Sequence, residues 1–218
     1  MRTETTTRTL YKFEELPEET REKVIENLYD INVNYDGWSE GIIEDAKTIG
    51  ALMGIDIKNV YWSGFFSQGD GACFEGRFDQ TRGALKAVKE YAPKDKELHR
   101  IAKGLQSLKP FGIYANVKHS GHYYHEGCTN IDVLHDEKEI TAEQEEACIE
   151  LLRDFMKWIY KTLNASYDYL TSEEAIVETI NANEFEFDSQ GNLAQPAGAY
   201  PAKTKKRRRQ NENVKFYL

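Results

Sequence analysis

The chain has 218 residues, 40% of them hydrophobic and 12% aromatic, which is enough to build a globular core without disulfide bonds. Its formal charge is −9, although six lysines and arginines stand together at residues 203–209. An acidic body repels phosphates, so we expect no direct nucleic-acid binding, except through that basic tail. No apolar run is long enough to cross a bilayer, which argues against a membrane partner, and three cysteines without C-x-x-C spacing exclude a zinc finger.

The first predicted elements are a short strand within residues 8–16 and a helix that opens at Pro17, because proline fits the first turn of a helix. A second helix is expected at residues 38–53, where apolar side chains recur at helical spacing. Gly54 marks its end, since glycine readily adopts the left-handed conformation that closes a helix.

The next stretch is rich in aromatic residues and glycine and predicts a β-hairpin with strands near residues 60–66 and 72–78. An Asp-Gly pair at its turn tolerates positive φ angles. The alternation of a strand places Trp62 and Phe66 on one face. Trp62 and Phe74 share the apolar face of the hairpin, so we expect both to be buried under helices.

The second half of the chain repeats the order of helix and hairpin. The expected elements are helices at 82–91 and 95–108, strands at 111–118 and 128–134, a helix at 141–163 that opens with a capping box, a helix capped by Thr171 or Ser172, and an edge strand around Phe185 and Phe187. Together they predict an α+β fold, in which a four-stranded antiparallel sheet of two β-hairpins carries helices mainly on one face. We expect residues 1–188 to form a single domain and the polar, basic tail at 189–218 to be mobile.

Histidines gather at the end of the second hairpin, where His119, His122 and His125 flank Tyr123. Imidazole is a common metal ligand, but in an extended strand His119 and His125 stand roughly 20 Å apart and His122 faces the other way. The three rings converge on one metal ion only if the segment folds into a loop. A metal site, a binding patch without metal and a plain polar hairpin end are therefore the open alternatives, and we predict no metal and no cofactor.

Both hairpins present polar, glycine-rich ends within otherwise apolar sequence, and the second end carries more histidine and tyrosine than a solvated turn needs. No nucleophile motif and no evident Cys–His pair is present, so we assign no catalytic residue. We expect the two ends to form one patch, with these candidate binding residues: Gln68, Asp70, His119, His122, Tyr123 and His125.

Several sequence blocks resemble a group of uncharacterised proteins encoded by tailed phages and prophages, some of which are labelled antitoxin of a toxin–antitoxin stability system. The resemblance covers roughly residues 8–187 and leaves out the basic tail. It implies a phage accessory protein made in the cytoplasm of a bacterial host, and it offers no established reaction. The blocks are LYKFEEL at 10–16, EDAKTIG at 44–50, YWSGFFSQGDGA at 61–72, VKHSGHYYH at 117–125 and LLRDFM at 151–156.

The leading hypothesis is a non-enzymatic counter-defence protein that inhibits or sequesters a host defence or toxin component, with a host protein or a small nucleotide as its partner. The alternative is a metal-dependent enzyme acting on a nucleotide or phosphodiester, which would combine the histidines with Glu75, Asp132 or His135. A third class is nucleic-acid binding through the aromatic sheet and the tail. Few lysines and arginines interleave with the aromatic residues, which favours a packing role for most of the rings.

Overall fold

A computed structural model describes residues 7–194. These residues form two compact units, a larger one of residues 39–165 and a smaller one that joins residues 7–38 with 166–194. The long helix α5 (Ala142–Leu170) contributes to both units. Within the described part of the chain, no helix is at once long and apolar enough to cross a membrane.

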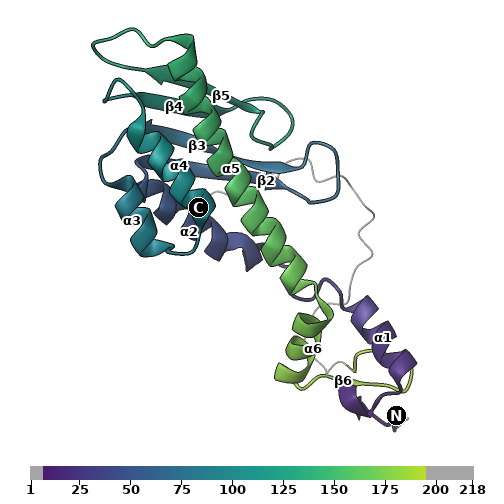
Figure 1. The fold of residues 1–218 in the computed structure, drawn as a ribbon. Coiled ribbons are helices and arrows are strands. Elements are labelled where there is room, and N and C mark those ends of the chain that lie inside the picture. The colour runs from purple at the N-terminus through teal and green to yellow at the C-terminus, as the bar shows by residue number, and fades with distance from the viewer. Residues whose placement is uncertain (1–6, 195–218) are drawn as a thin grey trace, which may run out of the picture. The chain divides into compact units, whose positions relative to one another are not determined.

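The larger unit is built on a four-stranded antiparallel sheet (Figure 1). Consecutive strands are neighbours, in the order β2-β3-β4-β5, so the sheet consists of two hairpins joined through the pair β3–β4. This arrangement confirms the predicted α+β fold. The strands are β2 (Ile55–Ser63), β3 (Gly71–Asp79), β4 (Tyr114–His119) and β5 (Thr129–Leu134).

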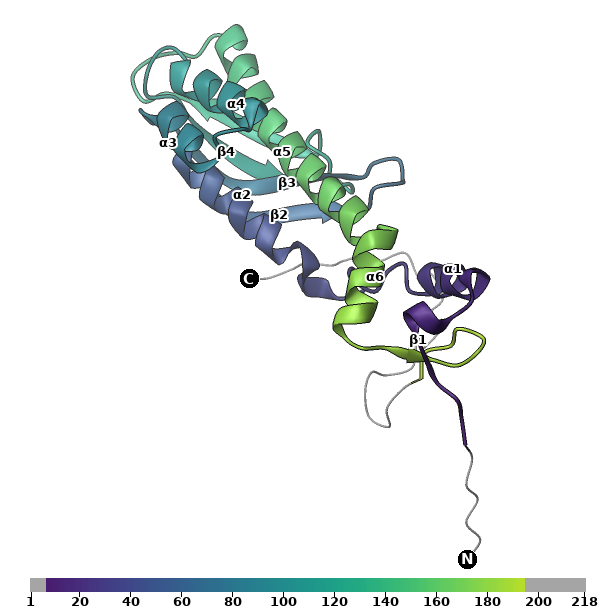
Figure 2. The same cartoon turned by 60° about the horizontal axis from the view of Figure 1, so that its bottom comes forward.

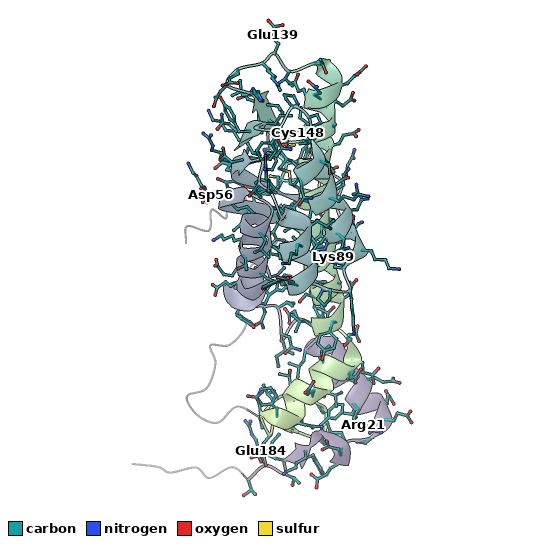
Figure 3. The ribbon with its side chains drawn as sticks, turned by 60° about the vertical axis from the view of Figure 1, so that its left-hand side comes forward. Arg21, Asp56, Lys89, Glu139, Cys148 and Glu184 are labelled. Atoms are coloured by element: carbon teal, nitrogen blue, oxygen red, sulfur yellow. The ribbon has the colours of Figure 1, made fainter. Side chains whose placement is uncertain are left out.

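Helices cover one face of this sheet (Figure 2). Phe74 of β3 is fully buried and meets Phe155 of α5 edge-to-face, with ring centroids 6.1 Å apart. Cys148 lies in the interior, whereas Asp56 and Lys89 project outward (Figure 3). The helices of this unit are α2 (Glu40–Leu52), preceded by the 3-10 turn η2 (Asp36–Ser39), α3 (Ala84–Tyr91), α4 (Lys96–Ser107) and most of α5.

The smaller unit has a core of its own. Its short strands β1 (Tyr11–Lys12) and β6 (Glu186–Phe187) pair antiparallel, and between them along the chain come the 3-10 turn η1 (Phe13–Glu15), α1 (Glu18–Asn27) and α6 (Glu173–Ala182). The buried side chains that hold it together are Phe13, Leu16, Val24, Ile176, Ile180 and Phe187.

Residues 189–194, which the sequence analysis assigned to the tail, continue the structure after β6. The Ala194 amide donates to Glu186 O at 2.7 Å, and Phe187 forms a β-bridge with Leu193. The rest of the predicted tail, including all of its basic residues, lies outside the described residues. The described residues form two compact units, and whether residues 1–188 behave as a single domain stays a prediction.

Several details differ from the expected elements. Strand β4 begins at Tyr114 and not at residue 111. Phe66 is not on a strand face: β2 ends at Ser63, and the Phe66 side chain is 82% exposed in the loop that follows. Trp62 is half-buried rather than buried. Helix α5 runs past residue 163 to Leu170, because neither glycine nor proline interrupts that segment.

Candidate functional site

Two loops leave the same end of the sheet, as Figure 1 shows. Residues 64–70 connect β2 to β3 and residues 120–128 connect β4 to β5; we call these two loops together the loop end. Because β3 and β4 are antiparallel, the start of β3 lies beside the end of β4. The loops are in direct contact, so the predicted meeting of the two hairpin ends is confirmed.

Two glycines allow this contact. A Cβ atom on Gly69 would come within 2.5 Å of Tyr123 Cδ1, and one on Gly71 would come within 2.5 Å of His125 Cα. Gly69 also has φ of +90°, a conformation that other residues adopt only with strain. Glycine at both positions therefore lets the second loop lie flat on the first.

The β2–β3 loop is held by one carboxylate. Asp70 Oδ2 accepts the backbone amides of Phe66 at 3.0 Å and Ser67 at 2.7 Å, and the Asp70 amide donates back to Ser67 O at 3.1 Å. These bonds fix the loop without a longer strand pairing. They hold the exposed Phe66 ring on a backbone of defined shape.

The β4–β5 loop is stabilised in the same local manner. The Ser120 amide donates to Cys128 O at 2.9 Å, which closes the base of the loop. His119 Nε2 lies 2.9 Å from Tyr123 O, and Thr129 Oγ1 donates to Glu126 O at 2.7 Å. His119 is therefore a framework residue of the loop.

Beneath this loop a ring cluster packs on the face of the sheet that the helices leave open. Tyr61 contacts both His119 and Tyr124, with ring centroids 5.1 and 5.8 Å away. The Tyr61 hydroxyl donates to Glu75 Oε2 at 2.8 Å, and the His119 amide donates to Glu75 Oε1 at 3.3 Å. Glu75 thereby ties β2, β3 and β4 together.

The pKa values of Tyr61 and Glu75 in this cluster shift in opposite directions. Burial, followed by the hydrogen bond and charge of Glu75, raises the pKa of Tyr61 to about 12. Burial alone would raise the pKa of Glu75, but hydrogen bonds from Tyr61, Asn59 and His119 outweigh it and hold that pKa below its ordinary value. Glu75 is thus an ionised, well-satisfied structural carboxylate.

Between the two loops lies a hollow of about 440 Å³. Tyr123 and His125 stack within it, with centroids 6.2 Å apart and planes 23° apart. Its lining combines these rings with two carboxylates, an amide and a glycine: Gln68, Gly69, Asp70, Tyr123, His125 and Glu126.

Four of the six predicted binding residues line this hollow, namely Gln68, Asp70, Tyr123 and His125. His122 lies beside it, edge-on to the Tyr123 ring at 5.3 Å between centroids. The structure thus brings the predicted residues to one place, and their binding role stays a prediction.

Three features of the loop end were not predicted from the sequence, namely the exposed Phe66, the position of Glu126 in the hollow and a Cys–His pair. Cys128 Sγ lies 3.4 Å from His125 Nε2, and the Gly127 amide donates to His125 Nδ1 at 3.1 Å. Because Nδ1 accepts this bond, the neutral ring carries its proton on Nε2, which faces the sulfur. The sequence signal for this pair was the spacing of three residues between His125 and Cys128, with Gly127 between them. That spacing brings the two side chains together only in a tight loop, and in an extended strand they lie apart.

Of the residues named for the enzyme alternative, Glu75 lies beside His119, whereas His135 and Asp132 lie elsewhere. His135 follows β5 at the opposite end of the sheet, where its Nε2 lies 3.0 Å from Phe111 O. Asp132 is exposed on β5, two strands away from Glu75. Within residues 7–194, no three His, Cys, Asp or Glu side chains are grouped so that they could hold a metal ion.

A family model described as a domain of unknown function, DUF8835, matches residues 38–173. The match includes the whole four-stranded sheet and both loops of the loop end. No curated protein and no solved structure matches the chain. Since the matched segment spans more than half of the sequence, the chain belongs to the DUF8835 family.

Proposed function

We propose that this protein is a non-enzymatic binding protein that engages a partner protein through its loop end. The observation that carries the proposal is Phe66, which is 82% exposed on a hydrogen-bonded loop beside the acidic hollow. In the phage setting that the sequence resemblance implies, the partner is a component of host defence or a toxin, which the protein inhibits or sequesters in the bacterial cytoplasm.

Phe66 has the properties of an interface anchor. Burying a phenylalanine side chain against a partner contributes about 1.5–3 kcal/mol, and aromatic anchors dominate the binding energy of many interfaces. The Asp70 carboxylate already holds the loop backbone, so little conformational entropy is lost on binding. An exposed aromatic ring on an ordered loop is therefore better explained by docking than by solvation.

The charge of the loop end favours a protein over a small nucleotide. Asp70 and Glu126 both line the hollow, and each repels a phosphate group. The nearby pair Tyr61 and Glu75, whose pKa values are shifted, forms a hydrogen bond within the sheet and does not line the hollow. The geometry thus supports recognition rather than phosphodiester chemistry.

Site-specific photocrosslinking tests this proposal. A benzoylphenylalanine at position 66 is expected to crosslink one bacterial protein in cells, and Phe66→Ala is expected to weaken capture of that protein at least tenfold with an unchanged melting temperature. The matched control is Phe111→Ala, because Phe111 is 43% exposed at the other end of the sheet.

Coexpression with the captured protein then tests inhibition, with wild type expected to suppress its activity and Phe66→Ala expected to fail. Equal capture by both alanine variants, or crosslinks spread over many proteins, would show that the loop end is not the interface.

A further inference from the structure

We infer that the hollow at the loop end receives an arginine side chain of the partner protein. This inference rests on the proposed function, since it names the chemistry that the same surface recognises. The charge of the lining, the stacked rings and the size of the hollow support this occupant.

The carboxylates of the hollow keep acceptor capacity. Asp70 uses Oδ2 for the two loop amides, whereas its Oδ1 accepts no hydrogen bond from residues 7–194. Glu126 Oε1 lies 4.0 Å from Lys157 Nζ, which is closer to Asp154 Oδ1, at 3.5 Å. Both contacts are ion pairs, so Lys157 offsets part of the charge of Glu126. Asp70 and Glu126 together still leave the lining of the hollow net negative, which favours a cation.

The rings select the kind of cation. A guanidinium group is planar, stacks on aromatic faces and donates several hydrogen bonds in one plane, whereas an ammonium group is a compact, strongly hydrated point charge. Tyr123 and His125 present nearly parallel rings next to the two carboxylates, and Gln68 adds an amide acceptor. This combination suits arginine better than lysine.

The size of the hollow is consistent with one side chain. Its volume of about 440 Å³ lies at the lower end of the range of small-ligand sites. A partner would thus insert a single arginine into the hollow while Phe66 contacts the surface around that residue.

The test titrates N-acetyl-arginine methylamide, as the probe, into the full chain. Binding is measured from the chemical-shift changes of the backbone amides in NMR spectra. We expect saturable shifts at Gln68, Gly69 and Asp70 in the millimolar range. The citrulline analogue has nearly the same shape without the charge, so it is expected to bind at least tenfold more weakly. The lysine analogue is expected to bind at least threefold more weakly.

Two variants assign the binding to the hollow. Glu126→Gln and Asp70→Asn are each expected to weaken the arginine probe at least fivefold, because each removes one negative charge. Asp70→Asn keeps a side-chain oxygen for the loop amides, and Glu126→Gln leaves the Thr129 bond to the backbone intact. The matched control, Asp132→Asn, removes the same charge from the exposed part of β5 and is expected to change nothing.

Equal binding of the arginine and citrulline probes would overturn the inference, as would an equal loss in Asp132→Asn. This failure is distinct from failure of the proposed function. If position 66 crosslinks a partner but the arginine probe does not bind, the hollow has no arginine specificity and the interface stands. If the probe binds but position 66 crosslinks nothing, the hollow recognises arginine and the assignment of Phe66 falls.

Discussion

Two neighbouring residues of β3 show how strand alternation sorts the side chains of this protein. Phe74 points into the helix-covered core and is fully buried, whereas Glu75 lies on the open face and accepts three hydrogen bonds that its side chain needs. The Glu75 carboxylate on the open face is therefore satisfied by hydrogen bonds from Asn59, Tyr61 and His119. Through Tyr61 and His119, Glu75 also fixes the ring cluster on which the β4–β5 loop packs.

Tyr61 gives a pH prediction. Its pKa is about 12 in the folded chain and near 10 when unfolded, so its contribution to stability is complete below pH 10 and is lost as pH rises toward 12. We expect the urea midpoint of wild type to fall more between pH 9.5 and 11.5 than that of Tyr61→Phe, which keeps the ring but cannot ionise. Equal falls of the urea midpoint in wild type and Tyr61→Phe would show that ionisation of Tyr61 does not affect the free energy of unfolding.

The three cysteines differ in predicted reactivity. Burial raises the pKa of Cys148 to about 12, and burial together with the charges of Cys128, Glu75 and Glu126 does the same for Cys73. The thiolate is the nucleophile, so neither residue should react in the native protein. We expect iodoacetamide to modify the partly exposed Cys128 first, and the other two only in guanidinium, as peptide mass spectrometry will show. Early labelling of Cys73 would contradict its burial.

At the scale of elements, α4 and α5 are joined through a helix cap. Asp95 caps α4 by accepting the Leu98 amide at 2.9 Å with Oδ1, and its Oδ2 accepts the Trp158 indole N–H of α5 at 2.8 Å. One side chain thus begins a helix and fixes its neighbour. The ion pairs Arg100–Asp154 and Lys161–Glu97 join the same two helices, but they lie nearer the solvent and contribute less.

We therefore expect Asp95→Ala to lower the free energy of unfolding by about 2–3 kcal/mol, since it removes a cap and a partly buried hydrogen bond. Asp95→Asn keeps an oxygen for the Leu98 amide and is expected to cost about 1 kcal/mol less than Asp95→Ala. Chemical denaturation of the two variants measures this difference. An equal loss in both would mean that only the Trp158 bond matters.

At the scale of the whole molecule, the described chain has two cores. The sheet and its helices share one core in residues 39–165, and the second core, around Phe187, draws its buried residues from residues 7–38 and 166–194. The loop end belongs wholly to the larger unit. The proposed binding surface is thus built by residues of the family-matched segment alone.

The two cores predict separable effects of core truncation. Phe187→Ala is expected to cost about 3–5 kcal/mol, with the loss of hydrogen-exchange protection greatest in α1 and α6. Phe74→Ala is the matched variant, expected to cost a similar amount with the loss greatest in β2, β3 and β4. Uniform loss throughout the chain in both variants would instead indicate one cooperative unit.

Much of the fold was predictable because local patterns and tertiary packing agree. The capping box at Thr141 and Gln144 forms in both directions, and Ser172 caps α6, as the sequence predicted. The strand order follows from two hairpins whose neighbours in sequence are neighbours in space. The strand predicted at 111–118 begins only at Tyr114, so Phe111 lies ahead of it and is exposed, with the Arg82 guanidinium over its ring at 4.7 Å.

By itself, the sequence determined the α+β class, the two hairpins and the polar residues at their ends, since alternation, helical spacing and turn residues are local properties. Only the tertiary structure decided that residues 64–70 form an ordered loop with Phe66 exposed, that Glu126 joins Asp70 in one hollow, and that Cys128 meets His125. The shared hollow depends on how two loops far apart in sequence fit together at Gly69 and Gly71. Such a fit depends on backbone geometry, which no local residue pattern specifies.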